Sequence, residues 1–182
     1  MIMQQIKKNE GWDVKIVIHC GKAQCGPAIC GCFKIRGRRG DGYIESESAI
    51  VTWCVGHLVT MSYPDAYDMK YKRWSLQTLP FLPREFKYEV IPGVAKQFAV
   101  VKGLLNRPEV DTIYVCTDSG REGEYIYRLV AQMAGVKGKR QKRVWIDSQT
   151  EEEILRGIKE ARTNQSMTIC PPLPICEPKR TI

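Results

Sequence analysis

The residues of this sequence best suited to chemistry are three acids that follow a short apolar run. Residues 112–117 form the run, Asp118 closes it, and Glu122 and Glu124 come soon after. Its β-branched and aromatic residues predict a buried strand, and the Ser-Gly pair after Asp118 predicts a turn into a helix. Carboxylates that converge at a strand end offer the hard oxygen ligands that Mg²⁺ prefers. The same acids would also complement the dipole of the helix, so their spacing leaves both interpretations open.

The elements that must position these acids can be predicted from apolar periodicity. Strands are predicted at residues 14–19, 49–55, 112–117 and 143–146, and helices at 94–105, 122–133 and 151–161, the last with Thr150 as its N-cap. Residues 62–92 are rich in proline and aromatics, which indicates a long ordered loop with short elements. Strands that alternate with helices predict an α/β fold. We expect a Rossmann-like, mostly parallel sheet of about four strands, flanked by helices. In such a sheet functional groups gather at the carboxyl ends of the strands, where Asp118 is expected.

Length and hydropathy indicate one ordinary domain. The chain has 182 residues, and we expect a leader at 1–13, a domain at 14–162 and a disordered or aberrant tail at 163–182. No apolar run approaches the ~18 residues of a membrane helix, and the N-terminus lacks the apolar segment of a secretory signal. We therefore expect a soluble, cytoplasmic protein with no membrane partner.

The charge of the chain is compatible with a nucleic-acid partner. The net charge is +8, and basic residues cluster at 34–39, 70–73 and 137–143. Tyr71 and Trp74 beside the second cluster could stack on bases or anchor a loop. Many soluble proteins are basic, however, so charge alone does not decide. The eight cysteines form no Cys-x-x-Cys pairs in residues 20–32, which argues against a zinc site.

Several motifs together resemble one enzyme family. Residues 117–124, Thr-Asp-Ser-Gly-Arg-Glu-Gly-Glu, are similar to the Asp-x-Asp-Arg-Glu-Gly-Glu signature of type IA DNA topoisomerases. Matches in the same order occur at residues 39–43, 51–58, 96–98 and 143–146. Residues 36–162 thus resemble the N-terminal TOPRIM domain of the topoisomerase III branch. The resemblance implies a TOPRIM fold, Mg²⁺ as cofactor and single-stranded or negatively supercoiled DNA as partner.

The resemblance also assigns roles to individual residues. Asp118 and Glu122 are the expected metal ligands, Glu122 and Arg121 the expected catalytic pair, and Arg121 the phosphate contact. Glu124 and His57 are expected to support this group, although His57 is equally well explained as a hydrogen-bonded turn residue. Further contacts to nucleic acid are expected from Lys96, Lys72 and Arg73. Gly120 replaces the middle acid of the signature, so the ligand set is one carboxylate short.

The implied activity is Mg²⁺-dependent cleavage of one DNA strand, strand passage and religation, in a bacterial cytoplasm near the nucleoid. The family's nucleophilic tyrosine belongs to a later domain of the same chain, which this sequence does not contain. We therefore expect the chain alone to be inactive. The alternatives are a non-catalytic remnant that binds nucleic acid, and another TOPRIM enzyme such as a primase or nuclease.

The first strand departs from the family pattern. The family continues there as Ala-Glu-Lys-Pro-Ser-Val-Ala, whose glutamate is its essential acid, whereas this chain has Cys-Gly-Lys-Ala-Gln-Cys at 20–25. Codons for residues 21–27, read one base later, can spell Glu-Lys-Pro-Ser-Val-Ala. Codons from residue 175, read two bases later, can spell Leu-Arg-Ala-Lys-Ala-Asp, which resembles the run that follows this domain in the family. We therefore hypothesise that the coding sequence contains frameshifts, natural or from sequencing, that affect residues 20–35 and the tail and spare the middle.

Overall fold

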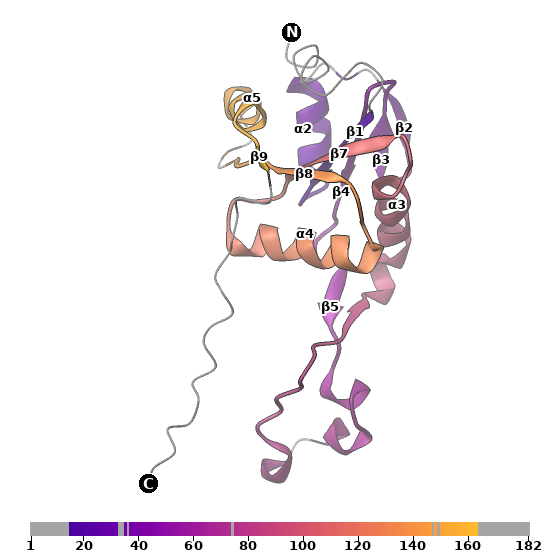
Figure 1. The fold of residues 1–182 in the computed structure, drawn as a ribbon, viewed down its shortest axis with the longest axis vertical. Coiled ribbons are helices and arrows are strands. Elements are labelled where there is room, and N and C mark those ends of the chain that lie inside the picture. Colours follow the sequence, from indigo (N-terminus) through magenta and orange to yellow (C-terminus); the bar gives the residue numbers. More distant parts are fainter. Residues whose placement is uncertain are drawn as a thin grey trace.

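A computed structural model describes residues 15–32, 35, 37–73, 75–146, 148 and 150–163. Its centre is a sheet of seven strands in the order β2-β3-β4-β1-β7-β8-β9 (Figure 1). The strands are β1 (Lys15–Cys20), β2 (Arg38–Gly40), β3 (Tyr43–Glu45), β4 (Ala49–Trp53), β7 (Val110–Cys116), β8 (Arg140–Arg143) and β9 (Arg162–Thr163). A separate antiparallel pair joins β5 (Val59–Met61) to β6 (Tyr88–Val90).

The predicted four-stranded parallel sheet is confirmed as the middle of this larger sheet. β1 pairs in parallel with β4 and β7, and β7 pairs in parallel with β8. The short strands β2, β3 and β9 add antiparallel edges. Sequence patterns missed these three because they contain only two or three residues each, which is too short for periodicity to register.

Alternation along β1 divides the core into two layers. Ile16 and Ile18 face one side, where they pack with α2 (Cys25–Cys32) and α5 (Glu151–Lys159). Val17 faces the other side, where it packs with α3 (Ala95–Leu105) and α4 (Arg121–Ala134). The sheet is therefore covered by helices on both faces, as parallel sheets usually are.

Two predictions for individual elements need correction. The predicted strand at 143–146 is displaced, because β8 ends at Arg143 and Val144 and Ile146 instead pack into the layer under α5. No element was predicted for residues 20–35, but α2 forms there and buries Gly26 and Ile29. Its apolar residues include cysteine and alanine, which contribute little to a recognisable helical periodicity, so the sequence pattern did not predict this helix. Thr150 is the N-cap residue of α5 as predicted, but its side chain makes no capping hydrogen bond.

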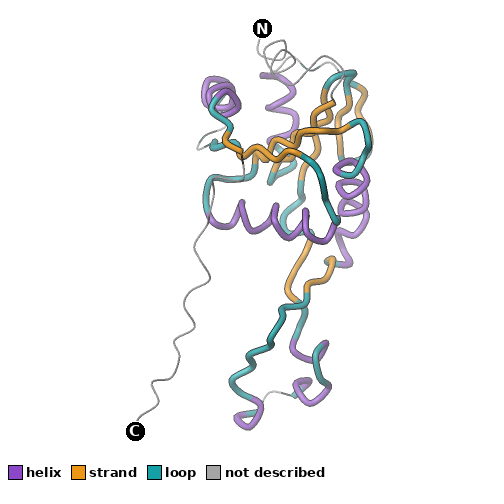
Figure 2. Tube along the Cα trace, viewed as in Figure 1, coloured by secondary structure: helices purple, strands orange, loops and turns teal. Residues whose placement is uncertain are grey.

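The predicted long loop is an arm that projects away from the sheet and its helices (Figure 2). We define the arm as residues 62–87, which connect β5 to β6 and are described except for residue 74. It contains three short 3-10 helices, η1 (Pro64–Ala66), η2 (Met69–Lys72) and η3 (Leu76–Thr78). Within the described residues, no helix combines the length and apolar character that crossing a membrane requires. The predicted leader and the tail beyond residue 163 lie outside the described residues.

Candidate functional site

The acids of the signature lie where β7 passes into α4. Asp118 follows the carboxyl end of β7, and α4 begins at Arg121 with Glu122 and Glu124 in its first turn. A Cβ atom added at Gly123 would lie 2.1 Å from the carbonyl oxygen of Asp118. Only glycine therefore lets the helix approach the strand end this closely. The predicted strand, turn and helix are confirmed here.

Arg143 is the buried hub under this strand end, a role that the sequence analysis did not predict. Its side chain is 2% exposed. Nη1 donates to the carbonyl oxygens of Val115 at 2.9 Å and Thr117 at 2.8 Å, and Nη2 donates to that of Asp118. These bonds fix the backbone that carries the Asp118 carboxylate. Burial lowers the pKa of Arg143, and the nearby Glu124 carboxylate opposes that shift.

Glu124 belongs to this buried network. Its Oε2 lies 3.1 Å from Nε of Arg143, and its Oε1 accepts from Nε of Arg128 at 2.7 Å. A carboxylate that is 10% exposed and paired with two guanidinium groups is positioned to hold the helix against the strand end. The supporting role expected for Glu124 at the metal site stays a prediction.

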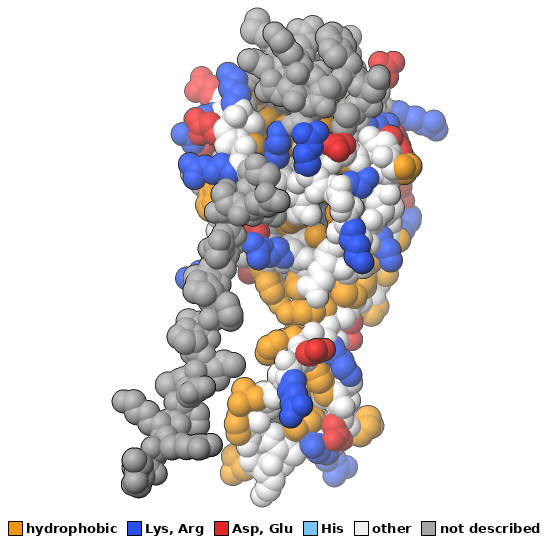
Figure 3. All heavy atoms as spheres, viewed as in Figure 1, with side chains coloured by type: hydrophobic (Ala, Val, Ile, Leu, Met, Phe, Trp, Pro, Cys, Tyr) orange, Lys and Arg blue, Asp and Glu red, His pale blue; other side chains and the backbone are white. Residues whose placement is uncertain are grey.

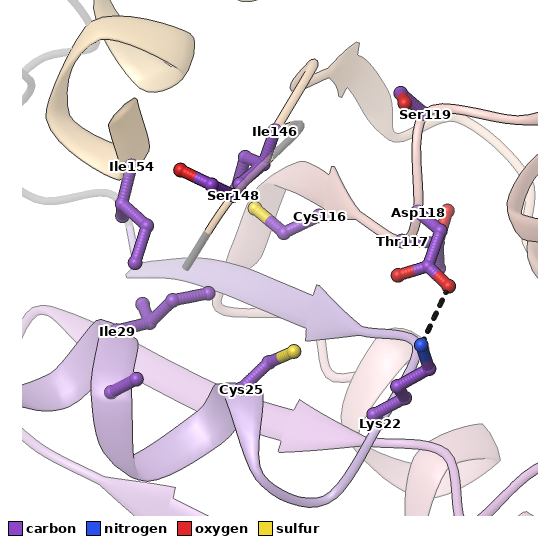
Figure 4. A pocket seen from close by; sticks show the side chains of 11 residues that line it. Lys22, Cys25, Ile29, Cys116, Thr117, Asp118, Ser119, Ile146, Ser148 and Ile154 are labelled. Carbon is purple, nitrogen blue, oxygen red and sulfur yellow. Dashed lines mark ion pairs between the residues drawn. The ribbon is translucent and has the colours of Figure 1, made fainter. Parts of the chain in front are cut away.

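Asp118 is open to solvent on its other side and already pairs with a cation of the chain. Nζ of Lys22 lies 3.0 Å from its Oδ2, and both side chains are more than half exposed (Figure 4). The two residues line a pocket of about 290 Å³ that also includes Cys25, Cys116 and Ser119. Burial raises the pKa of Cys116 to about 12, so it is a neutral thiol at pH 7 and a poor metal ligand or nucleophile.

The side chains of His57 and Glu122 are in contact, although the two residues are 65 positions apart in the sequence. Nε2 of His57, in the turn after β4, lies 2.5 Å from Oε1 of Glu122. The structure therefore places His57 beside Glu122, whereas Asp118 lies before the first residue of α4 and pairs with Lys22 instead. Arg121 lies exposed at the first position of α4, next to the same acids.

The residues predicted to contact nucleic acid are not gathered at one place. Nζ of Lys96 pairs with Oδ2 of Asp41 at 2.6 Å, and both are strongly exposed. Lys72 and Arg73 lie on the arm, which projects away from the sheet (Figure 1). Tyr71 packs edge-on against Phe81, with ring centroids 4.9 Å apart, so it serves as a loop anchor. Trp74 lies outside the described residues.

The exposed carboxylates of Asp118 and Glu122 could hold a cation such as Mg²⁺ only if water or phosphate supplied its other ligands. Among the residues that the structure describes, no group of three or more His, Cys, Asp or Glu side chains is arranged to hold a metal ion. Mg²⁺, however, commonly takes one or two carboxylates and completes its shell with water and phosphate oxygens. Asp118 and Glu122 are exposed carboxylates of that kind, and Lys22, 3.0 Å from Oδ2 of Asp118, would compete with a bound cation.

Comparison with known proteins places these residues in a family context. The Toprim domain model matches residues 30–148. DNA topoisomerase 3 of Shouchella clausii is 42% identical over 134 residues, which are 74% of this chain and 18% of that protein. The enzymes of the same name from Bacillus anthracis and Bacillus subtilis are 46% identical over 66% and 38% identical over 83% of this chain, respectively. The chain spans about a fifth of the length of these relatives.

A solved structure agrees at the level of the fold. Full-length topoisomerase I from Thermotoga maritima superposes with a TM-score of 0.53 at 20% identity, over 81% of this chain and 21% of that one. At this identity the similarity concerns the fold alone.

Proposed function

Because this chain belongs to the Toprim domain family, we propose that it is the Toprim part of a type IA DNA topoisomerase and that it binds Mg²⁺ together with a DNA phosphate. One observation carries the proposal. The carboxylates of Asp118 and Glu122 stand exposed at the junction of β7 and α4, and Arg143 fixes the backbone that carries Asp118. A rigid backbone under exposed ligands is what a preorganised metal site requires.

Each residue of the site has a distinct task in this proposal. Asp118 and Glu122 would hold the ion, which when bound supplies positive charge that orients phosphate oxygens. Arg121, exposed at the start of α4, would donate to the same phosphate. His57 would orient the Glu122 carboxylate through their hydrogen bond. Glu124 would keep α4 and the β7 end together through Arg143.

Titration with MgCl₂ tests the metal site. Calorimetry should detect Mg²⁺ binding to the wild-type chain, and Asp118→Asn, which keeps the shape but removes the charge, should abolish it. Glu47→Gln is the matched control, because Glu47 is also an exposed acid but lies before β4, away from the β7 end. Equal heats for the wild type and Asp118→Asn would reject the site.

The DNA partner needs a separate measurement. We expect a fluorescent single-stranded oligonucleotide to bind more tightly with Mg²⁺ than with EDTA, and this difference should vanish in Asp118→Asn. Binding without any Mg²⁺ dependence would favour the alternative, a non-catalytic remnant that uses only its basic surface. The ion pair between Lys22 and Asp118 supports this alternative, because the lysine already neutralises the carboxylate that would bind the metal.

We further propose that this chain alone neither cleaves nor relaxes DNA, because the family's nucleophilic tyrosine belongs to a different domain. The tyrosines nearest the acids are on α4, where Tyr127 is buried in the core and Tyr125 is partly exposed. Relaxation of negatively supercoiled plasmid by the purified chain would refute this. The bacterial nucleoid is the location that a DNA partner would imply.

The out-of-frame hypothesis for residues 20–35 also stays a proposal. It explains why Gly21, the neighbour of Lys22, stands where the family has its essential glutamate. The coding DNA decides it: if the codons for residues 21–27 cannot spell Glu-Lys-Pro-Ser in another frame, the hypothesis is wrong.

A further inference from the structure

The arm is an ordered element rather than a slack loop. Its base is the β5–β6 pair, in which Met61 lies opposite Tyr88. Inside it, the ring of Phe81 packs against Tyr67 and Tyr71 at centroid distances of 5.1 and 4.9 Å. Nζ of Lys87 donates to the carbonyl oxygen of Ala66 at 3.1 Å, which ties the two sides of the arm together. A projecting element with its own internal packing can present a surface of defined shape.

That surface is unusually apolar. Of the ten large hydrophobic side chains that are strongly exposed among the described residues, six lie on the arm: Tyr63, Met69, Leu76, Leu79, Leu82 and Phe86. Leu76 and Leu82 are more than 80% exposed. Figure 3 shows hydrophobic side chains along the arm and where it joins the rest of the molecule. Exposed apolar residues that gather on one element mark an interaction site.

The chemistry of these side chains selects a protein partner over a nucleic acid. Leu76, Leu82 and Met69 have no aromatic face on which a base could stack. Tyr67 and Tyr71 are engaged with Phe81, so among the six exposed side chains only Tyr63 and Phe86 present rings, against four aliphatic side chains. The arm carries five basic and three acidic residues in the sequence, so it lacks the strong positive charge that phosphate binding favours. An apolar protein surface is the better fit.

We infer that the arm is a docking surface for the polypeptide that makes up the rest of a DNA topoisomerase 3, and that this contact forms without a covalent link. The Toprim match at residues 30–148 includes the whole arm, so the arm belongs to the family domain. About four fifths of each relative's polypeptide lies outside the matched region. The arm projects from the sheet and its helices, free to reach a second body (Figure 2). The inference rests on the proposed topoisomerase function but not on the metal site.

Binding in trans tests the inference. The partner is the Bacillus subtilis DNA topoisomerase 3 polypeptide without its matched region, first checked for folding by circular dichroism. We expect it to bind the complete chain in biolayer interferometry, and Leu76→Asp with Leu82→Asp should weaken binding at least tenfold. Leu76→Met with Leu82→Met is the matched control and should keep binding. Because both leucines are so exposed, neither pair of substitutions should alter folding.

Protection of the arm in one covalent protein provides a second measurement that does not need a folded truncated partner. In a chimera, this chain replaces the matched region of the same relative. Trypsin should cut at Arg84 and Lys87 at least tenfold more slowly in the chimera than in the free chain. Equal cleavage rates would overturn the inference, as would equal binding by the Asp and Met variants.

Other occupants give different results. The chain alone could self-associate, and loss of that self-association in the Leu76→Asp, Leu82→Asp variant would assign the arm to a second copy. A tenfold loss of oligonucleotide binding in the same variant would assign the arm to DNA. Either result overturns the inference. Asp118→Asn should lose Mg²⁺ but keep the docking contact, so failure of the metal site and failure of the arm can be told apart.

Discussion

Replacement of Arg143 by leucine removes a buried charge that holds the candidate site together. The change leaves the carbonyl oxygens of Val115 and Thr117 without the donor that lies 2.9 and 2.8 Å away. It also removes the partner that lies 3.1 Å from Oε2 of the nearly buried Glu124. Breaking a buried ion pair from one side costs about 3–5 kcal/mol, because the remaining charge stays buried. Glu124 keeps its bond to Arg128, so we expect the lower end, about 3 kcal/mol.

Urea denaturation followed by circular dichroism measures this free energy of unfolding. In a domain of this size ~3 kcal/mol corresponds to a fall in Tm of roughly 6–12 °C. Arg128→Ala is the internal comparison, because Arg128 pairs with the same carboxylate but is half exposed, and such a pair contributes about 0.5 kcal/mol or less. If Arg143→Leu costs no more than Arg128→Ala, then Arg143 does not support the β7 end and the reasoning is refuted.

Three further perturbations test other parts of the structure. Lys22→Ala should raise the affinity for Mg²⁺ several-fold in calorimetry, because it frees Asp118, and an unchanged affinity would show that the lysine does not compete. Gly123→Ala should lower stability by about 1–3 kcal/mol in urea and weaken Mg²⁺ binding, because its Cβ would lie 2.1 Å from the carbonyl oxygen of Asp118; a wild-type midpoint would contradict this. Burial lowers the pKa of His19 from 6.5 to about 4. The unfolded chain therefore binds its proton first, and stability should fall by about 3 kcal/mol between pH 6.5 and 4, a loss that His19→Leu should reduce.

The acidic site could be predicted because its signals are local. A β-rich run, an acid and a Ser-Gly turn fix where β7 ends and α4 begins, and the parallel sheet follows from alternation of strands and helices. Asp118 at the strand end needed no long-range information. The pairing of His57 with Glu122, by contrast, joins residues 65 positions apart, and only the resemblance to a family hinted at it.

The rest could not be predicted because it depends on register and on tertiary partners. The sequence pattern predicts Arg143 at the start of an apolar strand, whereas it ends β8, whose four residues are all polar. Its burial depends on carbonyl groups at the end of β7. A charged residue beside an apolar run is a weak signal of such a hub. The position of Lys22 depends on the loop between β1 and α2, where the family pattern is lost. The exposure of the arm can be recognised only once the sheet and helices are in place.

The central position of β1 has a consequence for synthesis of the chain. Its two neighbours are β4, which begins at Ala49, and β7, which begins at Val110. At a translation rate of ~5–20 residues per second, the edge that pairs with β7 waits about 5–20 s for its partner to be made. During that time a strand whose sequence is mostly Ile, Val and Cys exposes an unpaired edge to other nascent chains. Chaperone demand and aggregation during expression should therefore depend on how fast residues 21–110 are translated, more than on the native stability of the fold.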